Sequence, residues 1–181
     1  MPNLDQRSLT IGQLRQWAVA GRVFAVIDAC DAPAVPPRLR ELGEDRAVSL
    51  YRGRAEEELW GIGPWLAQAD AETCDWIAGD LWSTPWGIFA IADADLDTMR
   101  THFRRLLVVK SPEGDPLYFR LYDPRVLPPF LAACTEAELD ELFGPIRAFG
   151  VTDPATYGLR LLLRRAGAPA DRAARPKVVR R

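Results

Sequence analysis

Two stretches of the chain are apolar on both of the alternating faces that a β-strand presents. They are RVFAVIDA at residues 22–29 and WGIFAIAD at residues 86–93. A strand with one face in water alternates polar and apolar residues, so runs of this kind predict strands that are covered on both sides. We therefore expect a central sheet that is flanked by helices.

Several segments around these strands have helical patterns. Residues 8–20 predict a short helix, and residues 96–107 carry an amphipathic stripe. Residues 54–82 read as two helical pieces separated by glycines and a proline, with Asp70 as the cap of the second piece. Residues 135–144 begin with the spacing of a capping box and end in glycine, as helices commonly do.

Shorter strands complete the expected sheet. They are predicted within AVSLYRG at residues 47–53, within LLVVK at residues 106–110 and at residues 117–122; the turn SPEGD joins the last two. Residues 146–151 and 157–165 predict a final hairpin, although the second of these segments could equally be helical. A crossover helix followed by a hairpin implies both parallel and antiparallel pairing. The expected fold class is α/β (α+β), with a mixed, partly antiparallel central sheet and a small C-terminal lobe made of helices and a hairpin.

A chain of 181 residues predicts one domain. We place it at residues 1–159, with possible sub-lobes at 1–122 and 123–165, followed by a flexible basic tail at 166–181. Residues 160–181 hold eight basic residues and one acidic residue, although the net charge of the chain is −2. Because this segment lacks interleaved aromatics and the rest of the chain is acidic, we interpret the tail as solvated and expect no nucleic-acid partner.

The chain lacks the apolar runs that membrane spans and secretory signals require, so we expect no membrane insertion and a cytoplasmic location. It also lacks the spacing of common catalytic, metal-binding and phosphate-binding motifs, so we expect no enzyme activity, cofactor or metal. The acidic stretch DADLD at residues 93–97 is interpreted as the start of a helix rather than a calcium loop. A small hydrolase that uses Cys30 or Asp28 with His102 is kept as an alternative.

The segment LYFRLYDPRVLPPFL at residues 117–131 places polar side chains among apolar ones. As a strand it would turn Leu117 towards the core, while Tyr118, Arg120 and Tyr122 would share the other face. Tyrosine and arginine are enriched among the residues that dominate the energy of protein–protein interfaces. The stripe is therefore a candidate binding surface.

In the same segment, the predicted structure changes from strand to helix at Asp123-Pro124. Asp123 can cap a helix whose first residue is Pro124, and the pair Pro128-Pro129 should then kink or restart that helix. Arg120 or Arg125 can also clasp a carboxylate, so a structural role and a partner-facing role both remain open. The candidate partner-binding residues are Trp82, Trp86, Tyr118, Arg120, Tyr122 and Arg125, and the candidate cap or clasp consists of Asp123 and Pro124.

Together, several motifs resemble a known family. They are, in order, FAVIDA, LYRG, GPWL, WGIF, an arginine-rich helix, FRLYDPRVL and FGPI, which cover roughly residues 21–150. This combination is similar to the effector chaperones, or adaptors, of the bacterial type VI secretion system, a family first catalogued as a domain of unknown function. The pair Pro128-Pro129 departs from the family pattern, in which the helix continues unbroken.

The resemblance implies a protein without catalysis of its own. Members of the family bind a cognate toxic effector in the cytoplasm and promote its loading onto the spike protein of the secretion apparatus. We therefore expect two protein partners, the effector and the spike protein. A toxin-neutralising immunity protein is the other binding function that the sequence leaves open.

Overall fold

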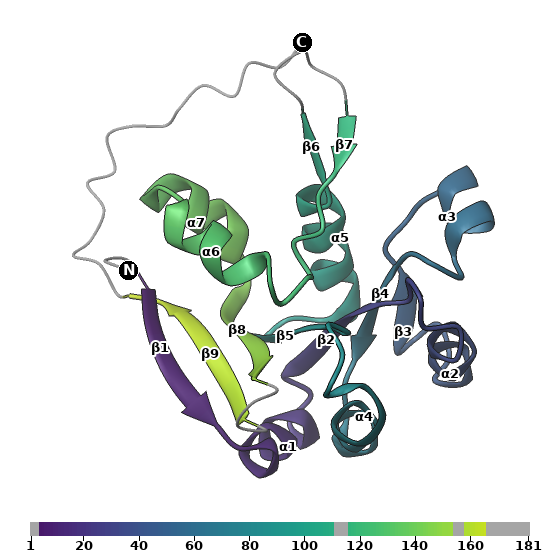
Figure 1. Cartoon of the computed structure of the whole chain (residues 1–181), viewed down its shortest axis with the longest axis horizontal. Coiled ribbons are helices and arrows are strands. Elements are labelled where there is room, and N and C mark those ends of the chain that lie inside the picture. The colour runs from purple at the N-terminus through teal and green to yellow at the C-terminus, as the bar shows by residue number, and fades with distance from the viewer. Residues whose placement is uncertain (1–3, 111–115, 154–157, 166–181) are drawn as a thin grey trace.

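The fold is built on one seven-stranded sheet and a separate two-stranded hairpin. A computed structural model describes residues 4–110, 116–153 and 158–165. Strands follow the order β1-β9-β8-β5-β2-β4-β3 across the large sheet, and β6 pairs with β7 in the small one (Figure 1). Their bounds are β1 Leu4–Leu9, β2 Val23–Asp28, β3 Ala47–Ser49, β4 Pro64–Gln68, β5 Gly87–Ala92, β6 Val108–Lys110, β7 Pro116–Tyr118, β8 Ile146–Asp153 and β9 Gly158–Arg164.

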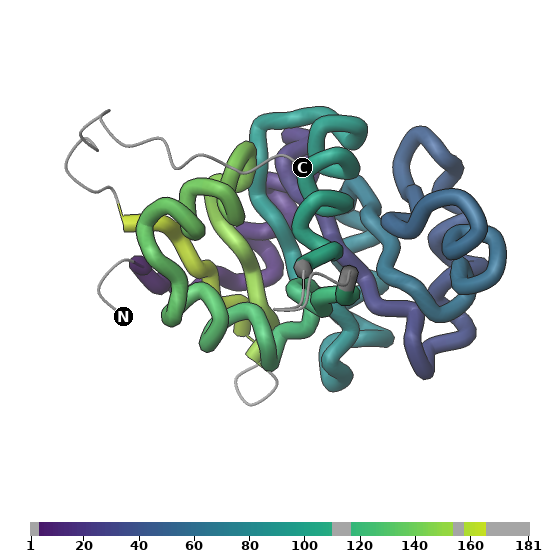
Figure 2. The backbone as a smooth tube through the Cα atoms, turned by 90° about the horizontal axis from the view of Figure 1, so that it is seen from above, coloured from purple at the N-terminus to yellow at the C-terminus, as the bar shows by residue number. Residues whose placement is uncertain are grey.

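Helices cover both faces of the large sheet, so the predicted fold class is confirmed. Three helices, α5, α6 and α7, lie on one face, whereas α1, α2 and α4 lie on the other (Figure 1). Seen from above, α5 and the α6–α7 pair lie side by side over the strands (Figure 2). The bounds are α1 Ile11–Val19, α2 Val35–Glu41, α3 Arg54–Leu59, α4 Ala71–Trp76, continued by the π-helical turn η1 Ile77–Leu81, α5 Leu96–Leu106, α6 Leu127–Ala133 and α7 Glu136–Phe143.

All pairs among the described strands are antiparallel, so the parallel pairs that we expected are not formed there. The reason lies after α5. This helix was expected to cross over to another strand of the main sheet, but it leads instead into the separate hairpin β6–β7. The final hairpin, β8–β9, adds to the main sheet between β1 and β5 and therefore belongs to the body of the fold.

The central strands β2 and β5 are buried along their whole length, as their apolar pattern predicts. Phe24 and Val26 of β2 face the layer of α5, α6 and α7, whereas Ala25 and Ile27 face the layer of α1, α2 and α4. One run of residues therefore supplies two hydrophobic cores, because successive side chains of a strand point to opposite faces.

Local capping fixes where several helices begin. Thr10 accepts a hydrogen bond from the amide of Gln13 at the start of α1, and Asp70 and Asp95 cap α4 and α5 in the same way. The predicted capping box at α7 is present: Thr135 and Glu138 each accept from the other's backbone. Asp95 lies in the acidic stretch that we interpreted as a helix start, and its position confirms that interpretation.

Two strands and one helix start differ from the sequence predictions. Strand β1 precedes α1, and β4 lies within the segment that we had read as wholly helical. Helix α6 begins at Leu127, so Asp123 and Pro124 form a turn before the helix instead of its first residues. Pro128 and Pro129 consequently occupy the first turn of α6, where they replace amides that have no acceptor within the helix. The predicted turn at 111–115 and the basic tail at 166–181 lie outside the described residues.

Candidate functional site

An ion pair joins the end of β2 to the loop that follows β7. Asp28, the last residue of β2, is 6% exposed and is paired through its Oδ2 with a guanidinium nitrogen of Arg120. The other oxygen of the carboxylate accepts a hydrogen bond from the amide of Cys30 at 3.0 Å. Desolvation tends to lower the pKa of Arg120, but the neighbouring Asp28 outweighs it and holds that pKa above its ordinary value. Arg120 therefore stays charged beside a buried carboxylate.

A small pocket of about 210 Å³ opens beside this pair. The guanidinium of Arg120 lies 5.9 Å from the ring centre of Tyr122, which is buried. Burial, followed by the charge of Asp28, raises the pKa of the Tyr122 hydroxyl, so this tyrosine is neutral at physiological pH. The residues that line the pocket are Asp28, Cys30, Tyr51, Ile62, Pro64, Leu107, Tyr118, Phe119, Arg120 and Tyr122.

Exposed apolar side chains gather at one rim of the pocket. The described part of the chain has six large, exposed apolar side chains, and four of them belong to β6 and β7. The register pairs Val108 with Tyr118 and Val109 with Leu117, so both faces of this hairpin are apolar. Tyr118, which is 60% exposed, contacts the ring of Tyr51 at a centroid distance of 5.1 Å. We define the hairpin surface as Ile62, Val108, Val109, Leu117 and Tyr118.

A second clasp lies a few residues further along the chain. Arg125 donates to both carboxylate oxygens of Asp123, from Nε at 2.9 Å and from Nη2 at 2.7 Å, and the Arg125 amide adds a third bond at 2.9 Å. These bonds hold the pKa of Asp123 below its ordinary value. The two arginines of the segment therefore bind different acids, and Asp123 acts as a clasp in the turn before α6.

Comparison with known proteins matches this region to a family. The family described as a domain of unknown function (DUF4123) matches residues 23–141. The chain belongs to this family. No curated protein and no solved structure matches it. The family match runs from β2 into α7, so it includes both clasps, the small pocket and the hairpin surface, whereas β1, α1, β8 and β9 lie outside it.

Within this DUF4123 chain, some candidate residues lie elsewhere than the sequence suggested. Trp82 and Trp86 are only 4% and 3% exposed, so they belong to the core under α1 and α4 and form no part of an outer surface. Leu117, which we expected in the core, is 51% exposed. The strand β7 ends at Tyr118, so Arg120 and Tyr122 do not share a strand face with it. Tyr118 and Arg120 nevertheless both line the small pocket, because the loop after β7 places Arg120 there.

The structure does not bring together the Cys30 and His102 of the hydrolase alternative. Cys30 lines the small pocket, where desolvation and the carboxylates of Asp31 and Asp28 raise its pKa. His102 lies in α5 and is buried, with Nε2 at 2.9 Å from the carbonyl oxygen of Leu142 in α7. In this arrangement His102 links two helices, and the Cys30 thiol is held in its protonated, less nucleophilic form.

Sequence reasoning missed three parts of the site. Tyr51 and Ile62 come from loops on either side of α3, where no periodic pattern points to a common pocket. The role of Asp28 as the partner of Arg120 was missed because the two residues are 92 positions apart. One signal for the hairpin surface was present: LLVVK is apolar at successive positions in a short segment beside a turn.

None of the described helices combines the length and apolar character that a membrane span requires.

Proposed function

We propose that this protein is a cytoplasmic chaperone, or adaptor, that binds a cognate effector of a type VI secretion system and promotes its loading onto the spike protein. The ordered motifs from FAVIDA to FGPI support the link to such chaperones. The observation that carries the proposed binding role is the hairpin surface. It is apolar, exposed and adjacent to an arginine and two tyrosines, a composition typical of protein interfaces.

Exposure of the hairpin surface to water is energetically unfavourable when no partner protein covers it. A two-stranded hairpin has little stability in water unless it packs against something. Here both faces of the hairpin carry exposed apolar side chains, with Leu117 at 51% and Val108 at 47% exposed. Burying such side chains in a complex contributes roughly 25 cal/mol per Å² of apolar area removed from water. A binding partner would therefore supply the packing that the hairpin lacks.

The neighbouring pocket provides the polar part of the proposed contact. Arg120 is held by Asp28, so its position is set before any partner arrives. A side chain fixed in this way loses less rotational freedom on binding than a free one does. Tyr51 and Tyr118, which contact each other, form an aromatic rim beside it. The proposed interface is thus an apolar hairpin with a preorganised arginine at its base.

Co-expression with the cognate effector, sought as a toxin encoded next to this gene, tests this proposal. We expect the two proteins to co-purify and the effector to become more soluble. The variant Leu117→Asp should weaken the complex at least tenfold, because it places a charge in the apolar contact. Val19→Asp is the matched control, since Val19 is 79% exposed on α1, which is not part of the hairpin surface. Binding can be measured by titration calorimetry.

Three outcomes would contradict the proposal. No complex and no change in effector solubility would remove its basis. Equal losses in the two aspartate variants would show that the hairpin surface is not the contact. Protection of cells from the toxin by this chain alone, without any effect on secretion, would indicate an immunity protein instead.

A further inference from the structure

The small pocket beside the hairpin surface has a buried floor and an exposed rim. Pro64, Leu107 and Tyr122 are buried and form the floor. Ile62 and Tyr118 stand at the rim, where they are 56% and 60% exposed. A buried floor inside an exposed rim suits the insertion of one side chain of a partner, as at the centre of many protein interfaces.

The volume of the pocket matches one aromatic side chain. An apolar cavity of about 150 Å³ is large enough to hold a benzene molecule. The small pocket measures about 210 Å³, so it has room for a phenyl or phenol ring and for the methylene group that joins the ring to its backbone. A much smaller side chain would leave part of the pocket without contacts.

The charges that line the pocket balance each other. Asp28 and Arg120 form an ion pair, and the other ionisable side chains among the described lining residues are a cysteine and three tyrosines. Desolvation raises the pKa of Cys30, Tyr51 and Tyr122, so these three groups are neutral at physiological pH. A charged side chain would lose hydration here without meeting a net opposite charge. The pocket therefore favours an uncharged occupant.

The rim and one wall of the pocket favour an aromatic ring over an aliphatic group. The ring centres of Tyr51 and Tyr118 are 5.1 Å apart, and their planes are inclined by 58°. Aromatic rings attract each other at such distances and angles, so a third ring can pack against this pair. The guanidinium of Arg120 lies 5.9 Å from the ring centre of Tyr122, and arginine also stacks on aromatic faces.

Arg120 has hydrogen-bond donors left for the backbone of the occupant. A guanidinium carries several N–H groups, and among the described residues that of Arg120 donates only to Asp28. Its side chain is 49% exposed, so its other N–H groups can be reached from outside. A carbonyl oxygen next to the inserted side chain can accept from one of them while the ion pair stays intact.

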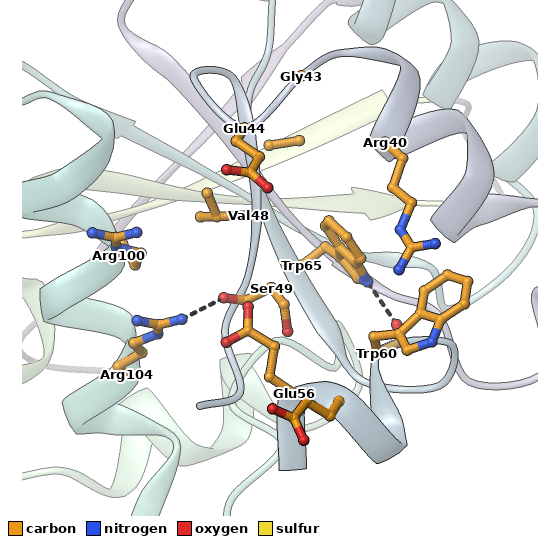
Figure 3. A pocket seen from close by; sticks show the side chains of 12 residues that line it. Arg40, Gly43, Glu44, Val48, Ser49, Glu56, Trp60, Trp65, Arg100 and Arg104 are labelled. Atoms are coloured by element: carbon orange, nitrogen blue, oxygen red, sulfur yellow. Dashed lines mark hydrogen bonds between the residues drawn. The ribbon is translucent and has the colours of Figure 1, made fainter. Parts of the chain in front are cut away.

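The larger groove beside β3, of about 820 Å³, is less suited to such an anchor. Figure 3 shows Arg104 on one side of this groove and Arg40 beside Trp60 on the other. The guanidinium of Arg40 lies 3.5 Å from the ring centre of Trp60 and covers one face of that ring. Arg104 donates to the carbonyl of Ser49, which is buried. These groups contact each other, whereas the ring of Tyr118 in the small pocket is exposed.

We propose that the small pocket receives one uncharged aromatic side chain of the effector, and that Arg120 donates a hydrogen bond to a backbone carbonyl beside it. This inference rests on the proposed function and specifies the residue type that anchors the complex. Ile62 and Tyr118 belong to both the hairpin surface and the pocket lining, so a partner that covers the hairpin also reaches the pocket.

Single amino acids test the pocket without the effector. The probes are the N-acetylated, C-amidated forms of phenylalanine, leucine and lysine, each titrated into the full ¹⁵N-labelled chain. The phenylalanine probe should shift the amide resonances of Cys30 and Phe119 and bind about twofold to tenfold more tightly than the leucine probe. The lysine probe should bind most weakly. Equal or tighter binding of leucine or lysine, or no shift with any probe, would overturn the proposal.

Replacing one ring of the rim tests why the phenylalanine probe is preferred. Tyr118→Leu keeps an apolar side chain but removes the ring, and Tyr118→Phe is the matched control that keeps it. Because Tyr118 is 60% exposed, both variants should fold. The ratio of phenylalanine to leucine affinity should fall at least about twofold in Tyr118→Leu and stay unchanged in Tyr118→Phe. A ratio that is the same in both variants would contradict the proposed role of the rim.

Filling the pocket separates this inference from the proposed function. Cys30 is exposed and lines the pocket, so Cys30→Trp places a ring there, whereas Cys30→Ser is the matched control that leaves the pocket open. Cys30→Trp should weaken the effector complex at least about tenfold, and Cys30→Ser less than about twofold.

The outcomes of this experiment distinguish the two proposals. If Cys30→Trp binds the effector normally while Leu117→Asp does not, this inference fails and the proposed function stands. If the unaltered chain forms no complex at all, the proposed function fails and this inference fails with it. Should Cys30→Trp not fold, the ratio measured with Tyr118→Leu still decides whether the pocket selects an aromatic ring.

Discussion

Arg120 and Asp28 are 92 residues apart in the chain and form one ion pair across the small pocket. Asp28 is almost completely buried at the end of β2, whereas the side chain of Arg120 is about half exposed. The pair therefore attaches the loop after β7 to the centre of the main sheet. It also fixes the position of the hairpin surface, because Tyr118 lies two residues before Arg120.

Replacing Arg120 with alanine should lower the free energy of unfolding by about 1–2 kcal/mol. The loss arises because, among the described residues, the buried carboxylate of Asp28 would keep only its bond to the Cys30 amide. A buried charged group that has lost its partner is destabilising. The exposure of Arg120 keeps the expected value at the low end of this range. Urea unfolding followed by circular dichroism measures the change.

The matched control is the double variant Asp28→Asn with Arg120→Ala. With the charge of Asp28 removed, losing Arg120 should cost less than about 0.5 kcal/mol, so the two single changes should not add. Additive losses would contradict a direct interaction between the two side chains.

The parts of the fold that sequence patterns predicted are those with local causes. The doubly apolar runs identified β2 and β5, and the spacing of Thr135 and Glu138 identified the start of α7. Strand β4 was missed because Gly63 and Pro64 look like a break between helices. It is a strand because β2 and β3 pair with it on either side, and neither pairing is visible in a local pattern.

The candidate site was predicted only in part, again because tertiary contacts that no local pattern shows place some of its residues. The alternation of residues 117–122 suggested one long strand, but β6 has only three residues and α5 precedes it closely. Beyond the pair Val108–Tyr118, the Phe119 amide still donates to the Leu107 carbonyl at 2.8 Å, and the strand pairing ends there. Side chains after Tyr118 are therefore placed by tertiary contacts, as in the ion pair of Arg120. Trp82 and Trp86 were misplaced because a large aromatic residue suits a core as well as an interface.

The position of Pro129 in α6 predicts whether its replacement by alanine stabilises or destabilises the folded protein. Pro129 lies in the first turn of α6, where its missing amide removes no helical hydrogen bond. Pro129→Ala should therefore cost about 0.4–1 kcal/mol, because the unfolded chain gains freedom. A proline inside a continuous helix would behave in the opposite way, since its removal would stabilise the helix by about 3 kcal/mol. Thermal unfolding distinguishes the two, and a large gain in stability would contradict the observed start of α6.

Gly87 is predicted to tolerate no side chain. Its φ is +147°, and a Cβ atom there would lie 2.0 Å from the carbonyl oxygen of Val26 in the neighbouring strand β2. Gly87→Ala should therefore cost more than about 3 kcal/mol or prevent folding, because backbone atoms of two buried central strands would have to separate. Gly61→Ala is the control, since no atom lies within 4 Å of its Cβ position. Similar urea midpoints for the two variants would contradict this close approach.

His102 should make the stability of the protein depend on pH. Burial lowers its pKa in the folded state, an effect that Arg105 reinforces and that the Leu142 carbonyl and Glu141 partly oppose. In the unfolded chain the imidazole takes up a proton near pH 6.5. In the folded protein it takes up a proton only at lower pH, because its pKa is lowered. Well above pH 6.5 both states are neutral and the contribution of His102 to stability is complete. As the pH falls below 6.5, the unfolded state gains a proton and that contribution is lost.

The variant His102→Gln isolates this effect, because its amide can still donate to the Leu142 carbonyl but does not titrate. Urea unfolding at pH 8, 7, 6 and 5.5 gives the difference in free energy of unfolding between the two proteins. The carboxylates are common to both proteins, so their titration cancels in that difference. We expect the advantage of the unaltered chain to be largest at pH 8 and to shrink steadily below pH 6.5. A difference that stays constant across this range would show that His102 is protonated equally in the folded and unfolded chains.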